Sequence, residues 1–431
     1  MKKLFLFLSM FTIISLKTFA QQDTTVVKVA EKVEEVKGAL EGLNESYLET
    51  KSIVDALKKI KISGYIQTQF QSADVDGIAS FSGGNFGAGM HNRLMIRRGR
   101  LKITYDNDLT NYVLQIDATE KGLGLKDAYI LFTEPWMKTF ALKAGVFNRP
   151  FGFEIDYSSS NRESPERSRL FQTLFPGERD LGMSLEIAPK SDFLSIFNFK
   201  GGLFAGNGVN PEVDNQKDFI GRLGFQLPFT EENFEIDGGI STYMGKVKLA
   251  PGKSIFTVSS PTLATATTSE VWADRSYLGL DAQVYYSLPL LGGFTLRGEF
   301  INGKQPGGSS TSSSSPTALQ TGDLYLRNFS GYYLMYVQNL GDKNQLVVKY
   351  DSYDPNSAVS GDQIGQVSAA KLSAGDLKYS TLGLGWVHYW DDNIKFTFYY
   401  DSVSNETSKN LAVYNQDLKD NVFTFRIQYK F

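Results

Sequence analysis

The stretch N-V-F-T-F-R-I-Q-Y-K-F, residues 421–431, alternates between apolar and polar side chains from its third residue onward. The apolar positions are Phe423, Phe425, Ile427, Tyr429 and Phe431, and the polar positions are Thr424, Arg426, Gln428 and Lys430. A period of two residues is typical of a β-strand whose two faces meet different surroundings. The stretch therefore predicts a strand with one apolar face and one polar face.

The same alternation extends back to Gly64, in segments of about ten residues that are separated by turn residues. We expect strands near residues 64–71, 93–105, 111–118, 125–133, 139–147, 181–188, 193–204, 218–228, 234–246, 275–288, 293–302, 325–339, 344–353, 377–390, 394–402 and 421–431. The pattern thus predicts about sixteen strands.

The connections between these strands alternate in length. The short turns are Asp106-Asn107-Asp108, Glu134-Pro135-Trp136, Pro189-Lys190-Ser191, Thr230-Glu231-Glu232, Pro289-Leu290-Leu291, Gly341-Asp342-Lys343 and Asp391-Asp392. Longer polar loops lie between them, and we interpret residues 247–274 and the Ser-rich residues 303–322 as mobile external loops. Alternating short and long connections give a sheet two different ends, as in bacterial outer-membrane barrels.

A closed barrel accounts for the aromatic final strand. In lipid every backbone N–H and C=O must be paired within the protein, so a spanning sheet must join its last strand to its first. We therefore predict an all-β fold over residues 62–431, a sixteen-stranded antiparallel transmembrane β-barrel with Tyr429 and Phe431 in the periplasmic aromatic girdle. The alternative is a soluble β-sandwich or secreted adhesin, which would have to explain apolar faces that point outward all round.

The first sixty residues have a different pattern. Residues 1–20 are typical of a secretory signal peptide, with Lys2 and Lys3 before an apolar run and Thr18-Phe19-Ala20 as the cleavage site. Residues 23–61 predict a short periplasmic coiled-coil helix. Its seam positions are Val26, Val29, Val33, Val36, Leu40, Leu43, Tyr47, Thr50, Val54 and Leu57. Other copies of the chain would supply the partner helices, in a dimer or a trimer; the alternative is a single amphipathic helix folded against its own body.

Composition excludes several classes of function. The chain has no cysteine, which excludes thiolate metal sites, and its formal net charge of −3 provides no basic excess for binding nucleic acid. It has two histidines, His91 and His388, and neither is accompanied by a nucleophile motif. We expect no enzyme activity, no cofactor and no bound metal; a hydrolase within the barrel is the alternative, and it would depend on these histidines.

The second predicted strand assigns the two faces of the wall. Leu101 and its alternate neighbours Ile103 and Tyr105 are apolar, whereas Arg98, Arg100, Lys102 and Thr104 share the other face. A cation on the lipid side costs about 2 to 4 kcal/mol at the midplane, so the basic face should line the lumen.

Folding the next strand back across the Asp106 to Asp108 turn places Lys102 near Val113, Arg100 near Gln115 and Arg98 near Asp117. Asp127 lies on the strand after that. Two interpretations stay open: a basic track that attracts anions, or cross-strand ion pairs that hold the wall together.

The loop between the fifth and sixth predicted strands, residues 148–179, is long and contains several large apolar residues. Its charged residues are Arg149, Arg162, Arg167, Arg169, Arg179, Glu154, Asp156, Glu163, Glu166 and Glu178, so its formal charge cancels. Its apolar residues include Phe151, Phe153, Leu170, Phe171, Leu174 and Phe175. We expect this loop to fold into the lumen and narrow it; the alternative is an external lid.

Several blocks of sequence together resemble the phosphate-selective porin family of Gram-negative outer membranes. They are Arg97-Arg98-Gly99-Arg100-Leu101, Asp127-Ala128-Tyr129, Gly145-Val146-Phe147-Asn148-Arg149-Pro150-Phe151-Gly152-Phe153-Glu154, Glu166-Arg167 and Gly177-Glu178-Arg179-Asp180-Leu181-Gly182. The resemblance implies a trimeric, passive, anion-permeable channel in the outer membrane lipid, with Arg98, Arg100 and Arg149 at its constriction.

We therefore expect an outer-membrane porin for small hydrophilic solutes or ions, anions such as phosphate among them. The alternative is a surface-binding or adhesion barrel without an open channel. Our candidates for pore-lining or selectivity residues are Arg98, Arg100, Lys102, Asp117, Asp127, Arg149, Arg162, Arg167, Arg169 and Arg179.

Overall fold

The computed structural model describes residues 2–191, 193–229, 233–260, 263–267, 271–288, 292–310, 319–366 and 372–431, with side chains from residue 26 onward except at 258–260 and 263–267. The predicted turns at 230–232 and 289–291, positions 311–318 of the Ser-rich loop and the side chains of the predicted signal peptide lie outside the described residues. The chain forms two compact units, Met1–Ile60 and Lys61–Phe431.

The first unit is formed by one helix, α1 (Lys2–Lys58). Its apolar seam is uncovered: Val33 is 59% exposed, Leu40 64% and Leu43 68%. An apolar stripe of that length is stable in water only when another surface covers it. No helix in the described part of the chain is long and apolar enough to cross a membrane.

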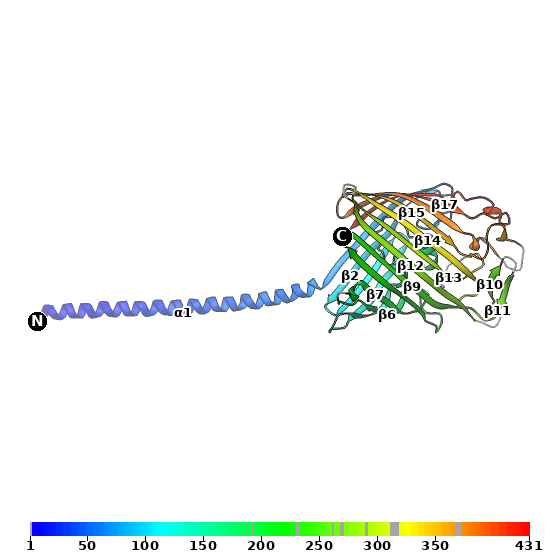
Figure 1. Cartoon of the computed structure of the whole chain (residues 1–431). Coiled ribbons are helices and arrows are strands. Elements are labelled where there is room, and N and C mark those ends of the chain that lie inside the picture. Colours follow the sequence, from blue (N-terminus) through cyan, green and yellow to red (C-terminus); the bar gives the residue numbers. More distant parts are fainter. Residues whose placement is uncertain are drawn as a thin grey trace. The chain divides into compact units, whose positions relative to one another are not determined.

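The second unit is a closed antiparallel β-barrel, as predicted (Figure 1). Its sixteen wall strands in the described residues are β1 (Ile60–Ala73), β2 (Asn92–Asn107), β3 (Thr110–Thr119), β4 (Gly122–Thr133), β5 (Phe140–Asn148), β6 (Arg179–Ile187), β7 (Phe197–Phe204), β8 (Asp218–Phe229), β9 (Phe234–Lys248), β12 (Trp272–Leu288), β13 (Gly292–Gly307), β14 (Leu324–Leu340), β15 (Asn344–Asp354), β16 (Tyr379–Tyr389), β17 (Ile394–Asn405) and β18 (Val422–Lys430). Each predicted strand corresponds to one of them.

The barrel closes where β18 meets β1. The two strands run antiparallel in register from Tyr65 opposite Lys430 to Ala73 opposite Val422, and β1 also pairs with β2. Closure leaves no open edge in the wall, which a sheet surrounded by lipid requires.

The two faces of the wall differ in polarity in the way that alternation predicts. Outward side chains such as Phe423 and Ile427 on β18 are exposed, whereas Thr424 and Arg426 on the inner face are buried. The same inversion, apolar side chains outside and polar side chains inside, recurs around the ring. An exposed apolar band of this extent is typical of the lipid-facing surface of a transmembrane barrel.

The structure corrects two expectations. The predicted mobile loop at 247–274 contains a hairpin of β10 (Ile255–Ser260) and β11 (Leu263–Thr267), because β10 pairs in parallel with the start of β14.

The predicted register of β2 on β3 is wrong by two residues: Arg100 lies opposite Asp117, and Lys102 lies opposite Gln115. The turn is tighter than we assumed, because Asp108 adopts a φ of 54° in the left-handed region.

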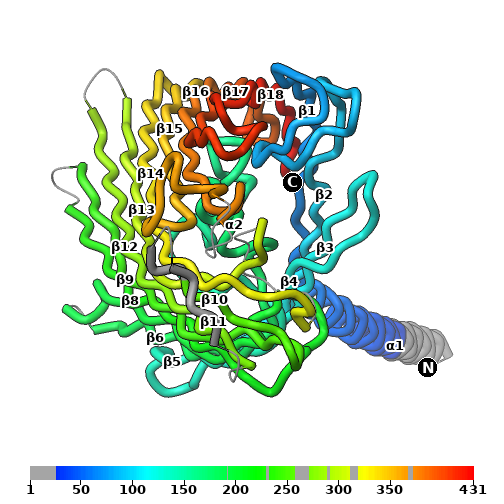
Figure 2. Tube along the Cα trace, turned by 90° about the vertical axis from the view of Figure 1, so that its right-hand side faces the viewer, coloured from blue at the N-terminus to red at the C-terminus, as the bar shows by residue number. Residues whose placement is uncertain are grey.

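Residues 149–178, called the interior loop below, pass through the inside of the ring. The loop carries the short helix α2 (Arg169–Leu174), which Figure 2 shows within the ring of strands. Its apolar side chains, Phe151, Leu170, Phe171, Leu174 and Phe175, are at most 1% exposed and belong to one core cluster with inward residues such as Tyr277 and Tyr333. The interior of this barrel is therefore partly a packed core.

Glycines in the wall make room for this packing. A Cβ atom on Gly279 of β12 would lie 2.8 Å from the Phe151 ring, and one on Gly331 of β14 would lie 2.7 Å from Leu170. Both distances are shorter than van der Waals contact allows, so larger residues there would push the interior loop off the wall.

Candidate pore constriction

The strongest ionic anchor of the interior loop is Glu166. Its carboxylate accepts hydrogen bonds of 2.8 Å from Arg97 and Arg98 on β2 and from Arg426 on β18. Burial raises the pKa of this carboxyl, but the three guanidinium groups outweigh burial and hold the pKa well below its usual range. Glu166 therefore ties the loop to the seam where the barrel closes.

Further anchors fix the loop to two other strands of the wall, β13 and β15. Lys349 on β15 donates a hydrogen bond of 2.8 Å to Glu154, and Arg297 on β13 donates one of 2.8 Å to Glu163. Glu299 on β13 accepts from the backbone N–H groups of Phe153 and Glu154 at 2.8 and 2.6 Å. Buried ion pairs hold the geometry of a segment, since removal of one partner leaves an uncompensated charge.

The inner face of β2–β4 is where space remains. Three adjoining cavities of about 310, 270 and 250 Å³ follow this face. The first two share Arg97, Asp117 and Lys126, and the second and third share Arg100 and Arg167. The first reaches the β3–β4 turn, and the third reaches Phe431 at the short-turn end. We call this row of cavities the passage.

The passage is lined by an excess of positive charge. Its basic residues are Arg97, Arg98, Arg100, Lys102, Lys121, Lys126, Arg167, Arg179 and Lys430, and its acidic residues are Asp117, Asp127, Asp156, Glu166 and Glu178. Nine cations against five carboxylates leave a surplus of four positive charges. Low-dielectric walls concentrate the field of such a surplus on solutes inside.

The cations of the basic face fall into two groups, those with an ion-pair partner and those without one. Arg100 lies 3.4 Å from Asp117, and Arg179 lies 3.1 Å from Asp127, so these arginines form cross-strand ion pairs. The side chains of Lys102 and Lys126, in contrast, form no hydrogen bond or ion pair with another described residue, although the charge of Lys126 acts on Glu178. These two lysines thus line the passage without an ion pair to any described carboxylate.

Lys126 is a lining residue that the sequence alternation missed. The register of β3 on β4 shifts between Gln115, opposite Asp127, and Ile116, opposite Leu125. Lys126 is the extra residue of this β-bulge, and a bulge redirects a side chain that a strict two-residue period would assign to the lipid face. The sequence did contain a signal for this orientation: Lys126 and Asp127 follow a Gly-Leu-Gly-Leu run. Since a lysine on the lipid face costs free energy, both charged side chains could have been assigned to the lumen.

Seven of the ten candidate residues line the passage: Arg98, Arg100, Lys102, Asp117, Asp127, Arg167 and Arg179. The other three do not. Arg149, 1% exposed, pairs with Asp180 at 3.0 Å, and Arg162 donates to the backbone carbonyls of Ser164 and Pro165. The Arg169 guanidinium lies between the rings of Phe81 and Tyr379.

The two histidines lie in different surroundings. His91 contacts Asp76 at 2.8 Å in the β1–β2 loop, and His388 contacts Asn344 at 2.9 Å on the neighbouring strand β15. Neither lines the three cavities of the passage.

Glu178 gives a pH-dependent prediction. Burial raises its pKa, but Arg167, Arg179 and Lys126 outweigh burial and lower the pKa well below 4.5. A carboxyl whose pKa is lower in the folded state than in the unfolded state stabilises the fold at every pH above the unfolded-state pKa. This stabilisation is lost as the pH falls through the folded-state pKa. Glu178→Gln should therefore destabilise the barrel by about 2 kcal/mol at pH 7, with little change down to about pH 4.5.

Denaturant titration of the detergent-solubilised protein at several pH values would measure this difference. The difference between Glu178→Gln and the unmodified protein should shrink only under more acidic conditions. A difference that already vanishes near pH 6 would contradict the assigned ion pairs.

The sixteen-stranded barrel, the inward loop between β5 and β6 and a passage beside that loop define the porin fold. Among solved structures, the chain is similar to the anion-selective porin from Comamonas acidovorans, at 12% identity and a TM-score of 0.53, covering 86% of this chain and 99% of that one. It is also similar to OprB of Pseudomonas putida, at 9% identity and a TM-score of 0.54, covering 88% and 96% of the two chains.

The outer membrane channel DcaP of Acinetobacter baumannii is a third similar structure, at 10% identity and a TM-score of 0.51, covering 86% of this chain and 97% of that one. At these identities the likeness shows the fold alone. No protein-family model and no curated protein sequence matches the chain.

Proposed function

We propose that the protein is an outer-membrane porin of a Gram-negative bacterium that allows passive diffusion of small hydrophilic solutes and favours anions such as phosphate. The observation that carries this proposal is the row of three adjoining cavities between the two ends of the barrel, with a surplus of four positive charges. The interior loop, fixed to the wall at β13 and β15, sets the width of the passage, and the charge there selects which ions enter.

Conductance across a planar bilayer tests the proposal. With a salt gradient across the bilayer, we expect steady openings and a reversal potential of the sign given by anion permeation. Addition of phosphate should reduce chloride current if phosphate enters the same passage. A barrel that inserts but leaves the bilayer non-conducting would exclude a porin and favour a surface-binding barrel.

We further propose that residues 1–20 are removed as a signal peptide and that residues 23–61 form a periplasmic coiled coil, which joins three copies of the chain. The uncovered seam of α1 and its regular 3-4 spacing support this arrangement. Three chains would bury the seam and leave each barrel with its own passage.

Substitution of the seam tests the coiled coil. Val33→Lys combined with Leu40→Lys places two charges where helices must pack, so we expect at least a tenfold increase in dissociation of the oligomer on dilution in mild detergent, measured by mass. Glu41→Lys, which lies outside the seam, is the matched control. Equal masses for the two variants at every dilution would show that the oligomer does not depend on α1.

A further inference from the structure

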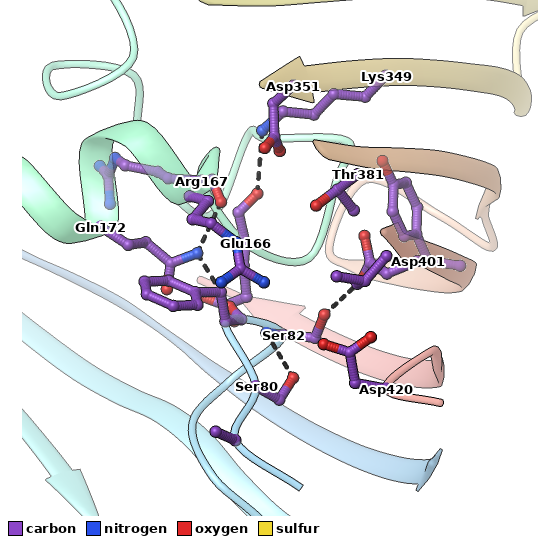
Figure 3. Close-up of a pocket in the computed structure, with 15 residues that line it drawn as sticks. Ser80, Ser82, Glu166, Arg167, Gln172, Lys349, Asp351, Thr381, Asp401 and Asp420 are labelled. Atoms are coloured by element: carbon purple, nitrogen blue, oxygen red, sulfur yellow. Dashed lines mark hydrogen bonds between the residues drawn. The ribbon is translucent and has the colours of Figure 1, made fainter. Parts of the chain in front are cut away.

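A fourth cavity, of about 30 Å³, borders the interior loop at Glu166, Arg167, Arg169 and Gln172 (Figure 3). It adjoins the passage, because Glu166, Arg167 and Gln172 also line the cavity of about 270 Å³. The rest of its lining comes from β15, β16, β17, residues 79–82 of the β1–β2 loop, and Asp420 shortly before β18. Its volume is sufficient for one or two water-sized species.

Besides Glu166, three carboxylates line this cavity, those of Asp351, Asp401 and Asp420. The strand register brings the first two together: Asp351 of β15 lies opposite Thr381 of β16, and Asp401 of β17 lies opposite Gly383, two residues further along β16. Figure 3 shows Asp351, Thr381 and Asp401 on neighbouring strands at the same side of the cavity.

The cations that line the cavity do not balance these carboxylates. Arg167 pairs with Glu178, and Lys349 pairs with Glu154 at 2.8 Å. Glu166, also in the lining, is satisfied by its three arginines.

Arg169 is the remaining cation in the described lining, and aromatic rings flank its guanidinium at 4.3 and 3.9 Å. Three carboxylates and one guanidinium leave an excess of two negative charges.

Three buried oxygen atoms in the lining have no hydrogen-bond partner among the described residues. They are Oδ1 of Asp351 and Oδ1 of Asp420, residues that are each 5% exposed, and the hydroxyl of Tyr399, a residue that is 2% exposed. A buried polar atom without a partner costs free energy, so such atoms are rare unless a water molecule or an ion completes them. The Tyr399 hydroxyl is not part of the acidic cluster, and it points independently to a missing ligand.

We infer that this cavity binds a divalent cation of the Ca²⁺ type. Ca²⁺ takes six to eight oxygen ligands, water among them, in flexible geometry. Asp351 and Asp401 would provide the carboxylates, and the hydroxyls of Thr381 and Tyr399 would provide neutral oxygens. The two positive charges of the ion would neutralise the two excess negative charges of the lining. No three Asp, Glu, His or Cys side chains of the described residues form a ready metal site, so hydroxyls and water must complete the coordination.

The ion would join three parts of the molecule. It would lie between the wall strands β15–β17, residues 79–82 and the interior loop at 166–172, because all three line the cavity. Ser82 already donates a hydrogen bond of 2.6 Å to Asp401, which links the β1–β2 loop to the wall. Bound Ca²⁺ therefore stabilises the segment that carries Glu166 and Arg167 beside the passage.

Calcium binding to the full-length protein tests the inference. After EDTA treatment and dialysis in detergent, titration with Ca²⁺ should show one saturable ion per chain and a rise in the unfolding midpoint. Asp351→Asn, which keeps the shape of the side chain, should weaken the affinity at least tenfold, and so should Asp401→Asn. Asp362→Asn, in an exposed loop outside the cavity, is the control and should bind as the unmodified protein does.

Terbium provides a second readout. Tb³⁺ bound in the cavity should give luminescence sensitised by Tyr399, which Ca²⁺ displaces and Tyr399→Phe reduces severalfold. If Asp351→Asn does not fold, Asp420→Asn replaces it, with a severalfold weaker affinity expected. Absence of saturable Ca²⁺ binding, or equal affinity in the cavity variants and the Asp362→Asn control, would overturn the inference whether or not the barrel conducts.

Discussion

Replacement of Lys102, Lys121 and Lys126 together by glutamate should reverse the anion preference that we propose for the passage. The substitutions turn a surplus of four positive charges into a surplus of two negative charges. Unit charges about 4 Å apart interact by about 1 kcal/mol in water and about 4 kcal/mol near a protein surface. We expect the anion-to-cation permeability ratio to fall by at least about tenfold, equivalent to about 1.4 kcal/mol, and to pass below one.

The lysines are suited to this test because their side chains form no hydrogen bond or ion pair with another described residue, and Lys126 acts on Glu178 through its charge alone. Reversal potentials in a planar bilayer under a salt gradient give the ratio directly. The measurement requires moderate ionic strength, since charges further apart than about 10 Å are screened at about 0.1 M salt. Lys190→Glu, at a short turn outside the passage, is the matched control. An unchanged sign of the reversal potential in the triple variant would refute the assigned passage.

Glu166→Gln should have the largest effect on stability. The substitution removes the charge that Arg97, Arg98 and Arg426 share, and the last two of these side chains are only 4% exposed. Removal of one partner from a buried ion pair typically costs about 3 to 5 kcal/mol. We expect a destabilised barrel, and a conductance that is larger and noisier because the interior loop loses its attachment at the β1–β18 seam.

Unfolding in denaturant and single-channel recording would measure the two effects. Glu212→Gln is the matched control, because the Glu212 side chain is 40% exposed and pairs with Lys217 at the surface. A Glu166→Gln protein that unfolds and conducts like this control would show that the anchor is unimportant.

The outline of the barrel could be predicted because the bilayer imposes a simple rule on the sequence. Alternation of apolar and polar residues identifies both the strands and their lipid-facing sides, and the aromatic residues 421–431 indicated closure. The hairpin at 255–267 was missed, because Ser- and Thr-rich sequence reads as loop and the pairing of β10 with β14 is between residues far apart in the chain.

The site was predictable only where it lies on regular strand. Arg100 and Lys102 follow the alternation, whereas Lys126 lies at a bulge that interrupts it. The sequence could not show which charged residues of the interior loop line the passage and which are buried, because the path of the loop determines whether its arginines face open space. Arg167 reaches the passage, whereas Arg149 is buried against Asp180.

The interior loop is attached to β2, β13, β15 and β18, so it cross-links wall strands that are not all neighbours in the sheet. A hollow barrel deforms to an oval cross-section under lateral pressure more easily than a barrel with cross-links through its interior. The aperture beside β2–β4 should therefore keep its width when the surrounding bilayer is stretched or thinned, and ion flow should be insensitive to membrane tension.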